Sequence, residues 1–356
     1  MIDWFNNKFD KSAIAKIGEC FENRSLSMGP QCGRLEEEIA GYTGSRFCVL
    51  TTSGSVALLM IALSLDLAGY EAIVQSRTWI ATPHAFKLAG MRVKVVDVLP
   101  SGSGFNLEEL KSHISKRTKV IVATHMNGNV SNASQLRSFC DEHGILLIED
   151  AAQALGSTQD QKMAGTYGLA GVYSFSVPKI ISGGQGGAIV TDCPELHLRL
   201  RNFLTHGLSS LVEISDWHWP GFNFRYNDVQ ASIVLTELQS IQSRIEHLRN
   251  IQYFYRAKLS DLPIEFLPYP QGQVGPYVEV IAHGRRDNLH KYLFDKNIIT
   301  RKFYPSISKA SYIISNACPN GETMATHGLY LPSGPSSSLA QLEEVVVEIR
   351  SFYENS

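Results

Sequence analysis

The sequence predicts an α/β protein with a mostly parallel central sheet and a small C-terminal α+β domain. In residues 47–192, short apolar segments alternate with helical stretches, the pattern of a parallel sheet with helices on both faces. In residues 227–258, apolar residues recur at helical spacing and predict one long helix. A strand and two helices are expected beyond it. We therefore divide the chain into a large domain, 1–235, and a small domain, 236–356.

Each element follows from apolar patterning and from residues that start or stop structure. The strands of the large domain are expected at 47–51, 72–75, 92–98, 119–124, 145–149, 171–176 and 188–191. The first helix is expected at 56–68, with Ser55 as its N-cap and Gly69 as its stop. Further helices are expected after Trp79, after a capping box at Asn106, and at 132–143. The small domain is expected to contain a strand at 277–282 and helices at 287–295 and 339–353.

Composition and charge exclude several classes of protein. The net charge of the 356 residues is −2, so no basic field indicates binding to nucleic acid or to an anionic membrane. No apolar run approaches the roughly 20 residues that span a bilayer, and residues 1–10 lack the apolar core of a signal peptide. The six cysteines are scattered without a CxxC pair. We therefore expect a cytoplasmic protein without metal or disulfides.

An acid and a lysine at the ends of neighbouring strands indicate pyridoxal phosphate (PLP) chemistry. Asp150 ends an apolar strand, and Lys179 follows the next strand, just before glycine-rich chain. A lysine forms a Schiff base with PLP, while a carboxylate keeps the pyridine nitrogen protonated. The alternative for Asp150 is a helix N-cap, and Lys179 taken alone would be an exposed surface lysine. Strand ends of a parallel sheet are where ligands bind, which favours the catalytic interpretation.

The remaining candidates surround this pair. The turn that contains Gly54 and Ser55, between a strand and a helix, is suited to bind phosphate through backbone N–H groups and hydroxyls. Ser174 is a second candidate for the phosphate. Trp79 is expected to stack on the cofactor ring, with a core position as the alternative, and Gln153 is expected to hydrogen-bond the ring hydroxyl.

These residues, in this order, resemble the DegT/DnrJ/EryC1/StrS family of PLP-dependent nucleotide-sugar aminotransferases. The likeness extends from Gly29 to Pro305. It includes the segments 53–58, 78–82, 149–154, 206–207 and 221–225.

The resemblance implies the PLP-dependent transferase fold type I, like that of aspartate aminotransferase. It also implies a function: moving an amino group from glutamate to a nucleotide-linked keto-sugar, in surface-polysaccharide or related amino-sugar biosynthesis. Lys179 would be the catalytic lysine. Asp150 and Gln153 would face the ring, Trp79 would stack on it, and Gly54, Ser55 and Ser174 would bind the phosphate. Asn223 would reach the phosphate of the neighbouring subunit, so that a homodimer shares its active sites.

The sequence departs from the family pattern at informative places. The ring-stacking aromatic residue is usually Phe or Tyr, and here it is Trp79. The pattern His-Leu-Tyr-Gly appears as His-Met-Asn-Gly at 125–128, and the usual histidine near Tyr304 is missing. The segment after Lys179 resembles the subgroup that aminates C4, with Gln185 in place of the usual Glu. We therefore expect a 4-keto-6-deoxy sugar. Nucleotide contacts are expected from the loop 208–220, which contains Trp217 and Trp219.

Three other functions remain as alternatives. A PLP-dependent sugar dehydratase of the same fold would carry histidine in place of Lys179. A non-catalytic regulatory relative would not need the set of Lys179, Asp150 and Gln153. A nicotinamide-binding protein would need a GxGxxG turn after the first strand, and the chain has none there.

Overall fold

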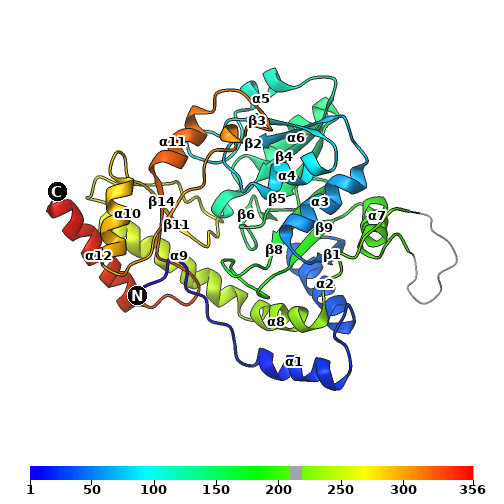
Figure 1. Ribbon diagram of the computed structural model, residues 1–356, viewed down its shortest axis with the longest axis horizontal. Helices are drawn as coiled ribbons and strands as arrows, with labels where there is room; N and C mark the ends of the chain where they lie inside the picture. Colours follow the sequence, from blue (N-terminus) through cyan, green and yellow to red (C-terminus); the bar gives the residue numbers. More distant parts are fainter. Residues whose placement is uncertain (209–218, 356) are drawn as a thin grey trace.

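The computed structural model describes residues 1–208 and 219–355. Within these residues, one eight-stranded sheet forms the centre of the protein, in the order β1-β9-β8-β5-β4-β2-β3-β13 (Figure 1). Its strands are β1 (Phe47–Thr51), β2 (Glu71–Gln75), β3 (Arg92–Val96), β4 (Thr118–Thr124), β5 (Leu146–Asp150), β8 (Ala170–Ser174), β9 (Gly187–Thr191) and β13 (Ile314–Ser315). Only β9 runs antiparallel to its neighbours, so the prediction of a mostly parallel sheet is confirmed.

Helices cover both faces of the sheet. They are α1 (Ala13–Glu22), α2 (Pro30–Thr43), α3 (Gly54–Leu65), α4 (Ala81–Leu88), α5 (Leu107–His113), α6 (Ala133–His143), α7 (Pro194–Leu204), α8 (Asp228–Leu238) and α9 (Ile241–Leu259). Successive side chains of a strand point to opposite faces. In β4, Ile121 therefore packs in the core beneath α2, α6 and α8, while Val120 and Val122 pack in the core beneath α3, α4 and α7.

A smaller sheet lies beside the large one. Its strands are antiparallel, in the order β10 (Glu265–Phe266), β11 (Val278–Ile281), β14 (Gly328–Leu331) and β12 (Arg301–Lys302). The helices of this region are α10 (Arg286–Asp295), α11 (Pro319–His327) and α12 (Leu339–Glu354). The short hairpin β6 (Thr158–Gln159) and β7 (Lys162–Met163) and the 3-10 turns η1 (Met126–Gly128) and η2 (Ile307–Lys309) complete the described elements.

Two predicted helices differ from the structure. The single helix expected at 227–258 is two helices, α8 and α9, with a break at Gln239 and Ser240. The hydroxyl of Ser240 donates to the carbonyl of Glu237, a local bond that competes with helix continuation. The helix expected at 56–68 begins at Gly54, because Ser53 and not Ser55 is its N-cap, and it ends at Leu65.

The chain passes between the two regions more than once. Helix α9 contributes Ile245 to the core of the large sheet and Tyr255 to the core of the small one. The N-terminus also belongs in part to the small region, because Ile2 pairs with Ile298 and packs in the core of that region. Strand β13 returns from the C-terminal part of the chain to the edge of the large sheet. The division at residue 235 remains a prediction.

No helix in the described part of the chain combines the length and the apolar character needed to cross a membrane.

Candidate active site

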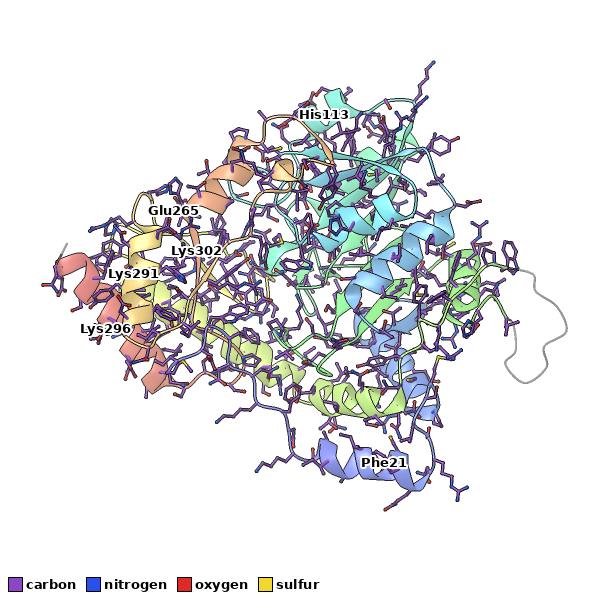
Figure 2. All side chains as sticks on the ribbon, in the orientation of Figure 1. Phe21, His113, Glu265, Lys291, Lys296 and Lys302 are labelled. Carbon is purple, nitrogen blue, oxygen red and sulfur yellow. The ribbon has the colours of Figure 1, made fainter. Side chains whose placement is uncertain are left out.

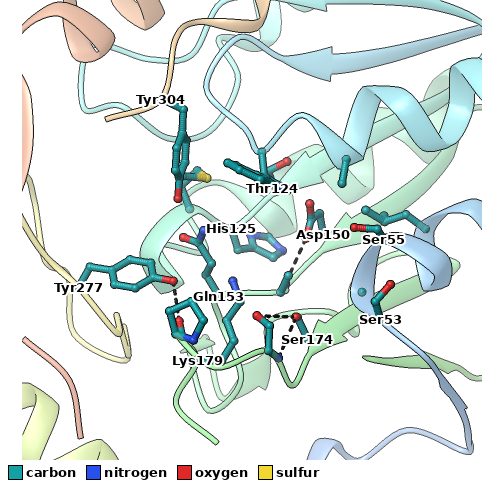
Figure 3. Close-up of a pocket in the computed structure, with 18 of the residues that line it drawn as sticks. Ser53, Ser55, Thr124, His125, Asp150, Gln153, Ser174, Lys179, Tyr277 and Tyr304 are labelled. Atoms are coloured by element: carbon teal, nitrogen blue, oxygen red, sulfur yellow. Dashed lines mark hydrogen bonds between the residues drawn. The ribbon is translucent and has the colours of Figure 1, made fainter. Parts of the chain in front are cut away.

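A pocket of about 270 Å³ lies where the carboxyl ends of β4, β5 and β8 meet (Figure 3). Several of its lining residues are those that the sequence selects: Gly54, Ser55, Trp79, Asp150, Gln153, Ser174 and Lys179. Asn223 is the one candidate that does not line it. Residues separated by up to 125 positions therefore meet at one sheet edge, as the strand-end argument predicts.

Lys179 enters the pocket from the loop after β8. Figure 3 shows its side chain extending toward the space between Gln153, His125 and Asp150. Burial lowers the pKa of the Lys179 ammonium to about 8; the carboxylate of Asp150 opposes this shift, and the guanidinium of Arg301 adds to it. At neutral pH a substantial fraction of the amine is therefore unprotonated, which is the form that acts as a nucleophile or a base.

The glycines after Lys179 allow the loop to pack against the rest of the site. A β-carbon on Gly186, whose φ is +138°, would lie 2.6 Å from the hydroxyl oxygen of Tyr226, and one on Gly187 would lie 2.5 Å from the carbonyl carbon of Ser53. Tyr226 also donates to the carbonyl of Gln185 at 2.7 Å. Gly186 and Ser53 form a β-bridge that joins this loop to the phosphate turn. Close packing against Tyr226 and Ser53 therefore accounts for Gly186 and Gly187.

Hydroxyl groups fix the carboxylate of Asp150. Thr82 donates to its Oδ2 at 2.5 Å, and the backbone N–H of Ala152 donates to its Oδ1 at 3.2 Å. Thr82 is in turn bonded to Thr78, and Thr78 to Thr124. Asp150 is buried and is followed by turns rather than by a helix, so the N-cap alternative is wrong. Each carboxylate oxygen accepts one hydrogen bond, and these two bonds hold the carboxylate in one orientation at the wall of the pocket.

Gln153 is oriented by the backbone of η1. Its Oε1 accepts a hydrogen bond of 2.8 Å from the N–H of Asn127, and no described residue accepts one from its amide nitrogen. Asn127 has a left-handed backbone (φ 48°, ψ 37°), a conformation that asparagine tolerates better than most residues. Its side chain pairs with the backbone of Tyr277 through bonds of 2.8 and 2.9 Å. The amide nitrogen of Gln153 is therefore the group presented to the pocket.

The turn between β1 and α3 has the properties of an anion site. Ser53 caps α3 by accepting a hydrogen bond from the N–H of Val56, which leaves the exposed hydroxyl of Ser55 without a partner among the described residues. A β-carbon on Gly54 would lie 3.1 Å from the β-carbon of Ser174, so this glycine permits the close approach of the turn to the end of β8. The free N–H groups of the first helical turn complete a positive end.

Trp79 lies on the wall of the pocket with 46% of its surface exposed. Its ring meets that of Tyr304 edge to face, with ring centroids 5.0 Å apart. The core alternative for Trp79 is therefore wrong, and part of the indole is open to the pocket.

Asn223 is exposed and lies outside the pocket. It forms a β-bridge with Thr205 at the base of the loop that follows α7. In the same loop Trp219 is exposed, whereas Trp217 lies outside the described residues. The prediction that Asn223 reaches the site of a second subunit is untested.

Several lining residues were not selected as site residues, and four of them carry polar or aromatic side chains of interest. His125, held by Glu149 at 2.8 Å, follows β4. Tyr277, Arg301 and Tyr304 come from the small region, and Tyr277 donates to the carbonyl of Pro178 at 2.6 Å, next to Lys179. Sequence spacing carried no signal for these three, because their approach depends on how the small region packs against the sheet.

The described residues fit PLP. One cavity is surrounded by five groups: a lysine of lowered pKa, a fixed carboxylate, an unpartnered amide nitrogen, an aromatic side chain and a helix N-terminus with a free hydroxyl. These are the groups needed to hold an aldehyde, a pyridine nitrogen, a ring hydroxyl, an aromatic ring and a phosphate. The fold and the site define the class of PLP-dependent transferases.

Comparison with known proteins identifies the family. Residues 7–350 match the DegT/DnrJ/EryC1/StrS aminotransferase family, and the chain belongs to it. It is a PLP-dependent aminotransferase. A solved structure, the aminotransferase TlmJ of Streptoalloteichus hindustanus, superposes with a TM-score of 0.93 at 26% identity and covers 99% of this chain and 98% of that one.

Relatives of nearly full length carry related names. The GDP-perosamine synthase of Vibrio cholerae is 27% identical and covers 99% of each chain. The dTDP-4-dehydro-2,3,6-trideoxy-D-glucose 4-aminotransferase of Saccharopolyspora spinosa is 28% identical over 95% of this chain and 93% of that one. The UDP-N-acetyl-3-dehydro-α-D-glucosamine 3-aminotransferase of Acidithiobacillus ferrooxidans is also 28% identical, over 95% and 92%.

Proposed function

We propose that this enzyme transfers the amino group of glutamate to the ketone of a nucleotide-linked sugar. The observation that carries the reaction class is the convergence of Lys179 and Asp150 in the pocket, in a chain that belongs to an aminotransferase family. The substrate class rests on the names of the full-length relatives, which include synthesis of GDP-perosamine and amination of dTDP- and UDP-linked keto-sugars.

The positions of the residues support the roles that we propose for them. Gly54, Ser55 and Ser174 hold the phosphate of the cofactor, Trp79 stacks on its ring, and Gln153 donates to the ring oxygen. Asp150 keeps a proton on the pyridine nitrogen. With that proton in place, bound PLP would supply electron withdrawal at the reacting carbon. Lys179 would hold the cofactor through its Nζ. Once the substrate has freed it, the same Nζ would take a proton from one carbon and return it to another. The pKa of about 8 suits both directions near neutral pH.

We further propose that the acceptor is a 4-keto-6-deoxy sugar. Support comes from the glycine segment after Lys179 and from the 4-aminotransferase among the relatives, although a 3-aminotransferase is equally similar. The dehydratase and regulatory alternatives are less well supported, because Lys179 and the complete set of cofactor contacts are present. We also propose a homodimer in which Asn223 completes the partner's site, and a cytoplasmic location.

Product analysis tests this function. The purified enzyme would be incubated with glutamate and a panel of 4-keto and 3-keto nucleotide sugars carrying GDP, dTDP or UDP. Mass spectrometry would detect an aminated product, and NMR would locate the amine. Amination at C4 supports the full proposal, and amination at C3 overturns the choice of carbon. A deoxygenated product, or none, overturns the proposed function. Lys179→Ala serves as the inactive control.

A further inference from the structure

A second cavity lies between the hairpin of β6 and β7, helix α9 and the loop 269–273. Its volume is about 590 Å³, within the roughly 300–1,000 Å³ of small-molecule pockets. None of the described residues that line it also lines the active-site pocket. Figure 2 shows α9 extending from the large sheet toward the small one, and this helix contributes Arg249 and Tyr253 to the cavity. The fold therefore leaves room for a ligand at a place separate from the active site.

Arg249 is a cation of this cavity without an anionic partner. Among the described residues, none forms an ion pair or a hydrogen bond with its guanidinium. The other two arginines of α9 differ, because Arg244 pairs with Glu237 at 2.7 Å and Arg256 donates to the carbonyl of Leu267. A planar guanidinium left free beside a cavity is suited to bind a phosphate or a carboxylate of a ligand.

Two tyrosines provide aromatic surface to the same cavity. Tyr253 follows Arg249 by one helical turn, and 61% of its surface is exposed. Tyr269 is half-buried, with the central carbon of the Arg256 guanidinium 5.9 Å from its ring centre. Aromatic side chains attract other flat rings through stacked or edge-to-face contacts. The cavity therefore combines a free cation with surface suited to an aromatic ring.

Two glutamines of the cavity carry hydrogen-bond acceptors that lack a donor. The amide nitrogens of Gln159 and Gln273 donate to the carbonyls of Ser131 and Asn127, at 2.6 and 2.7 Å, which identifies the other amide atom as the oxygen. Both amide oxygens are buried without a hydrogen-bond partner among the described residues, a state that costs free energy. Asp160, at the tip of the hairpin, adds a carboxylate. A ligand that brings N–H or O–H groups would complement these acceptors.

We propose that this cavity binds a nucleoside phosphate. An inorganic phosphate or a simple carboxylate would use Arg249 alone, and a neutral sugar would leave the guanidinium unpaired. A nucleoside phosphate uses all three features of the cavity. Its phosphate binds Arg249, its base lies against Tyr253, and its amino and hydroxyl groups donate to the free acceptors. This binding is independent of the reaction at Lys179, because it takes place in another cavity.

Hydrogen exchange measured by mass spectrometry can locate the ligand on the PLP-loaded enzyme, without amino donor or keto-sugar. ADP, GDP, UDP and dTDP are titrated, and protection is followed in the segments 158–163 and 249–273. Pyrophosphate and the uncharged nucleosides serve as fragments of the ligand, and GDP-mannose and UDP-glucose as its sugar-linked forms. The variants are Arg249→Met, Arg249→Lys and Tyr253→Ala. Lys258→Met is the matched control, because Lys258 is exposed on the same helix but does not line the cavity.

At least one nucleoside diphosphate should protect both segments of the wild type, and pyrophosphate and the nucleosides should bind more weakly. Arg249→Met should weaken this binding about 10- to 100-fold, as expected for the loss of hydrogen bonds to a charged group. Arg249→Lys should lose less, because it keeps the charge. Tyr253→Ala should weaken binding about 2- to 10-fold, and its exposed position makes a folding defect no explanation for that loss. Lys258→Met should match the wild type.

Pyrophosphate that binds as tightly as the nucleotides would show a site for anions only and overturn the proposal. So would protection confined to the active-site segments 53–58 and 174–179, or protection that both Arg249→Met and Tyr253→Ala leave unchanged. If free nucleotides bind more tightly than GDP-mannose and UDP-glucose, the ligand is a free nucleotide, and the reverse order identifies a sugar-linked one. If the cavity binds a nucleotide in an enzyme that aminates no nucleotide sugar, the proposed function fails and this site stands.

Discussion

The amine of Lys179 should be much more reactive near neutral pH than that of an ordinary lysine. With a pKa of about 8, roughly 24% of the amine is unprotonated at pH 7.5, against about 0.1% for a lysine with the usual pKa of 10.5, a ratio of roughly 240. Burial causes this shift because a low-dielectric surrounding disfavours the charged ammonium. Reactivity should rise with pH and level off above pH 8.

Two substitutions should move this midpoint in opposite directions. Asp150→Asn removes the neighbouring negative charge that stabilises the ammonium, so the pKa should fall further. Arg301→Met removes a neighbouring positive charge, so the pKa should rise toward its usual value. Both substitutions have a similar size to the original residue, and the sign of each effect follows from charge alone. Lys302→Met removes a more distant cation and serves as the control.

Competitive labelling measures these midpoints. The cofactor-free protein is treated with a trace of acetic anhydride between pH 6 and 11, unfolded and labelled to completion with a heavier isotope. Mass spectrometry then gives the extent of the first modification at Lys179, with the exposed Lys291 as an internal reference. A wild-type midpoint near 10.5, or shifts of the same sign in Asp150→Asn and Arg301→Met, would refute the electrostatic reasoning.

Three further predictions concern stability and assembly. In the cofactor-free protein, Lys179→Met should raise the melting temperature at pH 7. The pKa of Lys179 is lower in the folded than in the unfolded protein, so burial of the ammonium opposes folding. Calorimetry should show this gain in melting temperature shrinking as the pH rises from 8 to 10.5, and a pH-independent gain would contradict the prediction. Asn127→Ala should lower the free energy of unfolding by about 3–5 kcal/mol in urea titrations, because two buried hydrogen bonds to Tyr277 are lost and alanine disfavours the left-handed backbone. Asn127→Gly should cost about 1–2 kcal/mol less, since glycine tolerates that backbone, and equal losses would exclude a backbone contribution. Mixing inactive Lys179→Ala subunits with Asn223→Ala subunits should restore activity through one intact site per hybrid dimer, and a mixture no more active than its parts would rule out the shared site.

Much of the site was predictable because its residues follow strands. Asp150 ends β5, and Lys179 follows β8, so their meeting depends only on the rule that parallel strands share a carboxyl edge. Apolar runs placed seven of the eight strands of the large sheet to within two residues, whereas the short edge strand β13 was not predicted. Local chemistry was more ambiguous: Ser53 and Ser55 are both possible caps two positions apart, and only the geometry of α3 shows that Ser53 bonds the helix. Because Ser53 is the N-cap, the hydroxyl of Ser55 is available to a ligand.

The sequence alone determined the parallel sheet, the acid and lysine at its edge and the glycines beside the lysine. These features depend on interactions between residues close in the chain or on the two-residue period of a strand. The tertiary structure decided which groups orient them: Thr82 on Asp150, Asn127 on Gln153, and Tyr277 and Arg301 beside Lys179. Those contacts join segments that are not neighbours in the chain, and no local pattern encodes them. The contacts of Tyr277 and Arg301 also require the small region to pack against the sheet.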